Sequence, residues 1–68
     1  MIDNNIQAHI DKKKHDLQII IASIEAGNVG KLIKEDFYLC LLDLKNLGAI
    51  SGSELKRYYN DILKEHFK

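Results

Sequence analysis

The sequence predicts an all-α fold, with residues 1–68 forming one small domain of three antiparallel helices. Apolar residues recur at intervals of three and four along three stretches, which is typical of amphipathic helices. Two short glycine-containing segments separate these stretches, and short connections place consecutive helices side by side. We therefore expect helices near 5–26, 30–47 and 52–66.

The helix near 30–47 should be the centre of the fold, because it is the most apolar part of the chain. One stripe with 4-3-4-3 spacing contains Ile33, Phe37, Cys40, Leu44 and Leu47. Leu32, Leu39 and Leu42 fall on another side of the same helix. A helix that is apolar on two sides needs two partners, so we expect the rest of the chain on one side and a second copy on the other.

The helix near 5–26 begins after Asp3, Asn4 or Asn5, any of which can cap it. Its main apolar face contains Ile6, Ile10, Leu17, Ile20, Ile21 and Ile24. Lys13 lies at the centre of that face. Its amine can extend to water, which the polar surroundings 11–16 favour, or it can be a polar position that sets the register of a helix pair.

The boundaries between the helices have recognisable signals. Gly27 and Gly48 are suited to the left-handed position that ends a helix, while the next helix can begin at Asn28 or Gly30. Ser51 and Glu54 have the spacing of a capping box. Ile50 and Leu55 flank this cap as a hydrophobic staple would, so this boundary carries three agreeing signals.

The helix near 52–66 is amphipathic. Its predicted apolar face contains Leu55, Tyr58, Tyr59, Ile62, Leu63 and His66. The residues expected to face water are Lys56, Arg57, Asn60, Asp61, Lys64 and Glu65. Phe67 is placed to fold back over the end of this helix.

The segment Leu41–Leu63 resembles the helical hairpin of the SHOCT (short C-terminal domain) family. The matching residues, in order, are Leu44, Leu47, Gly48, Ile50, Ser51, Glu54 and Leu63. Leu55 stands where the family usually has an aromatic residue after the glutamate. The resemblance implies an oligomerisation or docking module and brings no catalytic residues.

Size and composition favour self-association. A chain of 68 residues buries only about 60% of the surface that it exposes when unfolded, and such small cores need reinforcement. A single cysteine cannot form an internal disulfide, and no Cys/His cluster suggests zinc. Assembly into a homodimer or higher oligomer is therefore the remaining source of added stability. We expect Leu32, Leu39 and Leu42 at this interface, with Ile19 and the small Ala22 allowing a helix to approach.

Charge and hydropathy restrict the partners and the location. Ten basic residues balance ten acidic ones, which gives the chain no general attraction to nucleic acid or anionic lipid. No apolar run is long enough for a membrane span, and no signal peptide opens the chain. With its single cysteine, the chain is expected to be cytoplasmic. Its Ile, Lys and Asn content suits a bacterial or phage genome.

Candidate catalytic and metal-binding groups have simpler interpretations. Cys40 lies on an apolar stripe, which favours a buried thiol over a nucleophile. Asp11 and His15 are spaced for an exposed ion pair but lack a third metal ligand. Asp36 and Asp43 mark an exposed edge of the central helix. The sequence therefore predicts a non-enzymatic protein that binds no cofactor or metal ion.

Two functions remain open. The first is a small regulatory protein that binds other proteins through an apolar helix face. The alternative is a dimeric nucleic-acid-binding regulator that uses the basic patch Lys12, Lys13 and Lys14. Tyr58 and Tyr59 could add a stacking surface to either function, although their place on the apolar face favours packing.

Overall fold

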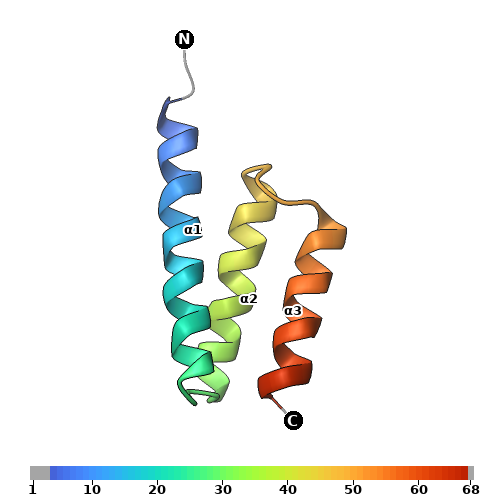
Figure 1. The fold of residues 1–68 in the computed structure, drawn as a ribbon. Helices are drawn as coiled ribbons and strands as arrows, with labels where there is room; N and C mark the ends of the chain where they lie inside the picture. Colours follow the sequence, from blue (N-terminus) through green and yellow to red (C-terminus); the bar gives the residue numbers. More distant parts are fainter. Residues whose placement is uncertain (1–3, 68) are drawn as a thin grey trace.

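The computed structural model describes residues 4–67, which form three α-helices (Figure 1). These are α1 (Asn4–Glu25), α2 (Lys31–Asn46) and α3 (Gly52–His66). No strand occurs within the described range. The prediction of an all-α fold is confirmed, and each helix boundary lies close to its predicted position.

The helix α2 lies between the other two and runs antiparallel to both (Figure 1). Both α1 and α3 pack against α2 and make little contact with each other. The molecule measures 45 × 21 × 15 Å over its Cα atoms. At 1.5 Å per residue, the 22 residues of α1 span about 33 Å and the 16 of α2 about 24 Å. The first turns of α1 therefore extend beyond α2, which leaves Ile6 47% exposed.

The core is small and centres on α2. Its buried side chains are Ile24, Phe37, Cys40, Leu41, Leu44 and Leu55. Four of the six belong to α2, and half-buried residues of α1 and α3 surround them. Leu41, which is fully buried, lies outside the predicted stripe. A helix with neighbours on two sides buries a wider arc than a single stripe describes, which is why the spacing alone did not identify Leu41.

Two Schellman motifs end α1 and α2. Gly27 has φ +106° and Gly48 has φ +82°, a region that disfavours side chains with a Cβ atom. The Gly27 N–H donates to the Ile24 carbonyl oxygen, and the next N–H donates to the Ser23 carbonyl oxygen at 3.0 Å. The same pair of bonds recurs after α2, from Gly48 and Ala49. Both predicted glycine ends are confirmed.

The helix starts differ in how they are capped. Gly30, and not Asn28, is the N-cap of α2, and it has no side chain to accept a hydrogen bond. At α3 the predicted capping box is present: the Glu54 N–H donates to Ser51 Oγ at 3.1 Å, and the Ser51 N–H donates to Glu54 Oε1 at 2.9 Å. The predicted cap Asp3 lies outside the described residues. Ile50 and Leu55 both join the core cluster, as the staple requires.

The predicted face of α3 needs one correction. Tyr58 is 46% exposed and does not share the apolar face with the half-buried Tyr59. The reason is that, among the described helices, only α2 packs closely on α3, so the buried arc of α3 is narrower than its apolar pattern. Phe67 does fold back against the core cluster, and the Lys34 amine lies 6.0 Å from the centre of its ring.

Ser51→Ala should lower the free energy of unfolding by about 1 kcal/mol, because the N–H of Glu54 loses its acceptor at the start of α3. Ser53→Ala, two residues later on an exposed site, is the matched control and should change stability by less than about 0.5 kcal/mol. Urea titration followed by circular dichroism measures both. Equal effects from the two substitutions would show that the capping box does not stabilise α3.

Candidate functional site: the open face of α2

Within residues 4–67, no other helix covers the side of α2 opposite its buried residues. Leu32 is 77% exposed and Leu39 is 54% exposed. Ile19 of α1, beside Leu39 in the same surface hollow, is 56% exposed. We call these three residues the open face.

One of the predicted interface residues, Leu42, does not lie on the open face. Leu42 is half-buried against the core cluster, so Leu32, Leu39 and Leu42 do not form one surface as predicted. Leu42 follows Leu39 by three residues, which is about 60° short of a full turn of the helix. It therefore lies to one side of the line through Leu32 and Leu39, on the side that faces α3. Ala22 is exposed, so the chain itself brings no helix against it.

A groove lies on each side of Leu39, and the two grooves carry opposite charge. The groove between α1 and α2 contains Asp16, Asp36 and Asp43 and one lysine, Lys13. The α2–α3 side is lined by two adjoining hollows that share Tyr38 and Tyr59. The charged residues of these hollows are Lys31, Lys34, Lys45, Lys56 and Glu35. The surface is thus acidic towards α1 and basic towards α3.

Aromatic rings form part of the basic side. The rings of Phe37 and Tyr59 are stacked, with centroids 6.0 Å apart and planes inclined by 23°. Tyr38 meets Tyr59 edge-on at 5.2 Å. Tyr59 is therefore held within the fold while Tyr58 points elsewhere, so the two tyrosines do not form a joint stacking surface. Tyr38 is a further residue of this surface, and its place one residue after a core phenylalanine puts it at the edge of the buried face.

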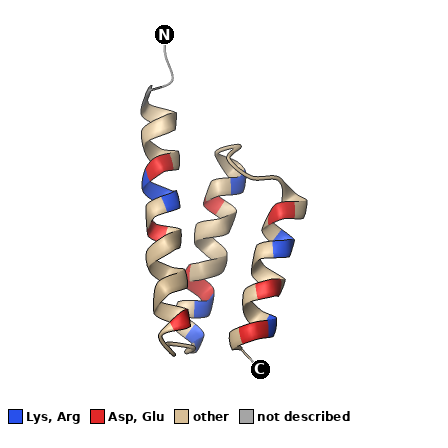
Figure 2. Cartoon of the chain, in the orientation of Figure 1, with Lys and Arg blue, Asp and Glu red and all other residues tan. Residues whose placement is uncertain are grey.

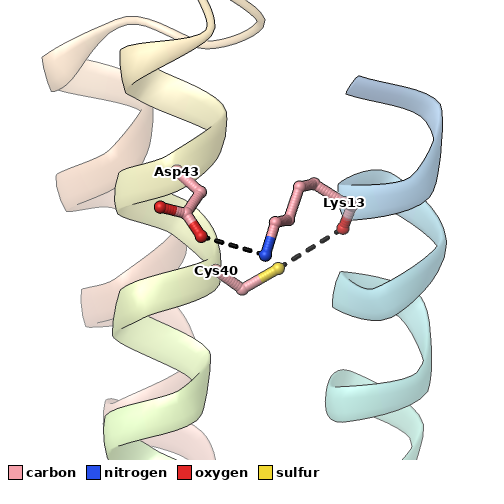
Figure 3. A network of polar contacts seen from close by, with 3 residues as sticks. All are labelled: Lys13, Cys40 and Asp43. Atoms are coloured by element: carbon pink, nitrogen blue, oxygen red, sulfur yellow. Dashed lines mark hydrogen bonds and ion pairs between the residues drawn. The ribbon is translucent and has the colours of Figure 1, made fainter. Parts of the chain in front are cut away.

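Lys13 makes the contacts that join the middle of α1 to α2 (Figure 3). Its Nζ lies 3.0 Å from Asp43 Oδ2, and its carbonyl oxygen accepts a hydrogen bond from Cys40 Sγ at 3.3 Å. The hydrogen bond and the charge of Asp43 raise the pKa of the Lys13 amine above its ordinary value. Lys13 is thus a polar residue at the contact between α1 and α2. Its amine pairs with Asp43 while its side chain stays partly exposed to water.

Cys40 and Asp43 have defined places in this contact. Cys40 is 5% exposed, and burial raises the pKa of its thiol, which keeps the sulfur protonated and able to donate. The predicted buried thiol is confirmed. Asp43 is more than a solvated charge on an edge, because its carboxylate bridges α2 to α1.

The lysines of the predicted basic patch do not all face the same way; Figure 2 shows this segment of α1 in blue, with acidic residues in red on either side of it. Lys12 and Lys14 are exposed, whereas Lys13 turns towards Asp43. The predicted pairing of Asp11 with His15 is not found: Asp11 Oδ1 accepts a hydrogen bond from Gln7 Nε2 at 3.0 Å. Gln7 is also four residues from Asp11, on its N-terminal side, so it competes with His15 for the same carboxylate.

In the described range 4–67, no group of three or more His, Cys, Asp or Glu side chains is arranged to hold a metal ion. None of the helices α1 to α3 combines the length and hydropathy needed to cross a membrane.

Comparison of the chain with family models, with curated proteins and with solved structures found no match. The SHOCT-like character of Leu41–Leu63 therefore remains a prediction. Any function proposed for this chain rests on its own residues and their geometry.

We predict that the Lys13–Asp43 ion pair contributes modestly and in a pH-dependent way. A double-mutant cycle with Lys13→Met and Asp43→Asn should give a coupling free energy of about 0.2–1 kcal/mol, because both side chains are partly exposed. Since folding raises the pKa of Lys13 above its ordinary value, this contribution is present in full at neutral pH and is lost as the pH rises through that raised pKa. Urea unfolding at pH 7 and pH 11 measures it, and a coupling that is equal at both values would contradict the ion pair.

Proposed function

We propose that this chain is a small, non-enzymatic regulatory protein that binds other proteins and acts as a homo-oligomer through its open face. The observation that carries this proposal is the exposure of Leu32, Leu39 and Ile19 on one side of a domain with so small a core. Large apolar side chains that gather on a surface commonly mark an interaction site.

The energetics support association. Burying a fully exposed leucine side chain is worth about 1.5–3 kcal/mol. The three side chains of the open face are 77%, 54% and 56% exposed, so covering each of them gains roughly half to three quarters of that value. A chain of 68 residues has a net stability of only a few kcal/mol, so burial of this size adds substantially to it. A two-fold interface would present the open face twice and double the apolar area removed from water.

The character of the polar groups supports a binding role over catalysis. The one cysteine is buried, and its thiol is held protonated and bonded to a carbonyl oxygen. A nucleophile needs the opposite, an accessible sulfur with a lowered pKa. The grooves beside Leu39 are open hollows with charges at their edges, which suits contact with another protein surface.

The alternative, a nucleic-acid-binding regulator, has less support. Of the three lysines in the predicted patch, Lys13 is engaged by Asp43, and only Lys12 and Lys14 are free to reach phosphates. The overall charge of the chain is zero. A cytoplasmic location likewise remains a prediction from the sequence.

Sedimentation equilibrium tests self-association. From micromolar to millimolar concentration, the average mass of the protein should rise from monomer towards dimer. Leu39→Asp should weaken association at least tenfold, because it places a charge at the centre of the open face. Tyr58→Asp is the matched control, since Tyr58 is also exposed but lines none of the hollows beside Leu39.

Circular dichroism must show that both variants remain helical. A wild-type protein that stays monomeric up to millimolar concentration would remove the basis of the proposal. Association that is weakened by Tyr58→Asp and not by Leu39→Asp would place the interface elsewhere.

A binding titration with duplex DNA and with single-stranded RNA separates the two functions. We expect no binding at micromolar protein, because the predicted patch keeps only two lysines outside the Lys13–Asp43 pair and the chain has no net charge. Affinity that falls steeply between 50 and 200 mM salt and is lost in Lys12→Gln/Lys14→Gln would favour the alternative.

A further inference from the structure

Three exposed residues of α2 repeat at an interval of seven. Leu32, Leu39 and Asn46 are each exposed and lie on one line along the helix. A seven-residue spacing of this kind forms the contact line between two helices that run side by side. An asparagine on such a line is tolerated because it can pair with the same residue of the other helix, and it favours parallel chains in register.

Opposite charges flank this line. On the side facing α1, Asp36 and Asp43 line the acidic groove. On the side facing α3, Lys31 and Lys45 line the basic hollows. In heptad positions with Leu32 as a, both aspartates take position e and both lysines take position g, where charges determine the choice and orientation of the partner helix.

The charges distinguish the two ways of placing a second copy on this face. If the two-fold axis runs parallel to α2, the acidic half of one copy lies over the basic half of the other, twice. If the axis runs perpendicular to α2, acidic half meets acidic half and basic meets basic. Like charges brought together across an interface are unfavourable, so only the first arrangement is complementary.

The register follows from the same positions. In a parallel pair, a residue at position g lies beside position e of the next heptad in the other helix, five residues further on. This places Lys31 of each copy beside Asp36 of the other. It also places Leu32, Leu39 and Asn46 against their own counterparts.

We propose that the open face of α2 binds a second copy of this chain, with the two α2 helices parallel and in register. This inference rests on the proposed homo-oligomeric function and adds the occupant, its direction and its register. The contact line consists of Leu32, Leu39 and Asn46, and the ion pairs join Lys31 to Asp36 of the second copy.

One residue opposes this arrangement and makes it testable. Glu35 is exposed at position d, so the parallel pair brings two Glu35 carboxylates close to the axis. Their repulsion weakens the dimer. Glu35→Leu should therefore tighten dimerisation at least tenfold in sedimentation equilibrium, whereas Glu65→Leu, on the solvent face of α3, should leave it unchanged.

Cysteine cross-linking tests the direction. In a Cys40→Ala background, Asn46→Cys should form a disulfide between copies under mild oxidation, because facing residues on the line approach within disulfide range. In an antiparallel pair centred on Leu39, the two residues at 46 would lie about 21 Å apart, and position 46 would face position 32. Glu65→Cys is the control and should not cross-link.

The outcomes are separable. Monomeric sedimentation of the unmodified protein up to millimolar concentration would defeat the homo-oligomeric function itself. A dimer that cross-links only in mixtures of Leu32→Cys and Asn46→Cys chains would overturn the parallel arrangement alone. A dimer that cross-links in neither way would show that α2 does not face α2.

Discussion

The fold depends on α2 being apolar around more of its circumference than its two neighbours can cover. Phe37, Leu41 and Leu44 are buried against α1 and α3, and nothing in the described chain covers the opposite side, where Leu32 and Leu39 are exposed. Because α1 and α3 scarcely touch each other, the helices do not close around α2. The exposed face is therefore a direct consequence of only two helices packing against one apolar helix.

The turns make that arrangement possible. Both glycine-ended helices stop with the same pair of hydrogen bonds, and the capping box at Ser51 starts α3 immediately afterwards. Because the helix ends are closely defined, the connecting segments are short, and consecutive helices pack side by side in antiparallel fashion. The contact of Lys13 with Cys40 and Asp43 adds a polar connection midway along α1, where its apolar stripe is interrupted.

The surface charges beside the exposed face favour one orientation of a bound partner. Asp36 and Lys31 lie on opposite flanks of Leu32 and Leu39, with the acidic groove towards α1 and the basic hollows towards α3. A partner that covered the apolar residues alone could bind in either direction. A partner that also matches the charges has one favourable orientation, and a second copy of the chain supplies such a match.

The sequence alone determined the helices and their ends, because apolar spacing, glycine at left-handed positions and the Ser51–Glu54 pair are local properties of the chain. It also predicted that Leu32 and Leu39 would have no partner within the chain. Tertiary structure decided that Leu42 turns inwards, that Tyr58 turns outwards, and that Lys13 reaches Asp43 instead of water. These outcomes depend on where a neighbouring helix ends and how wide an arc it covers, and periodicity within one helix carries no information about either.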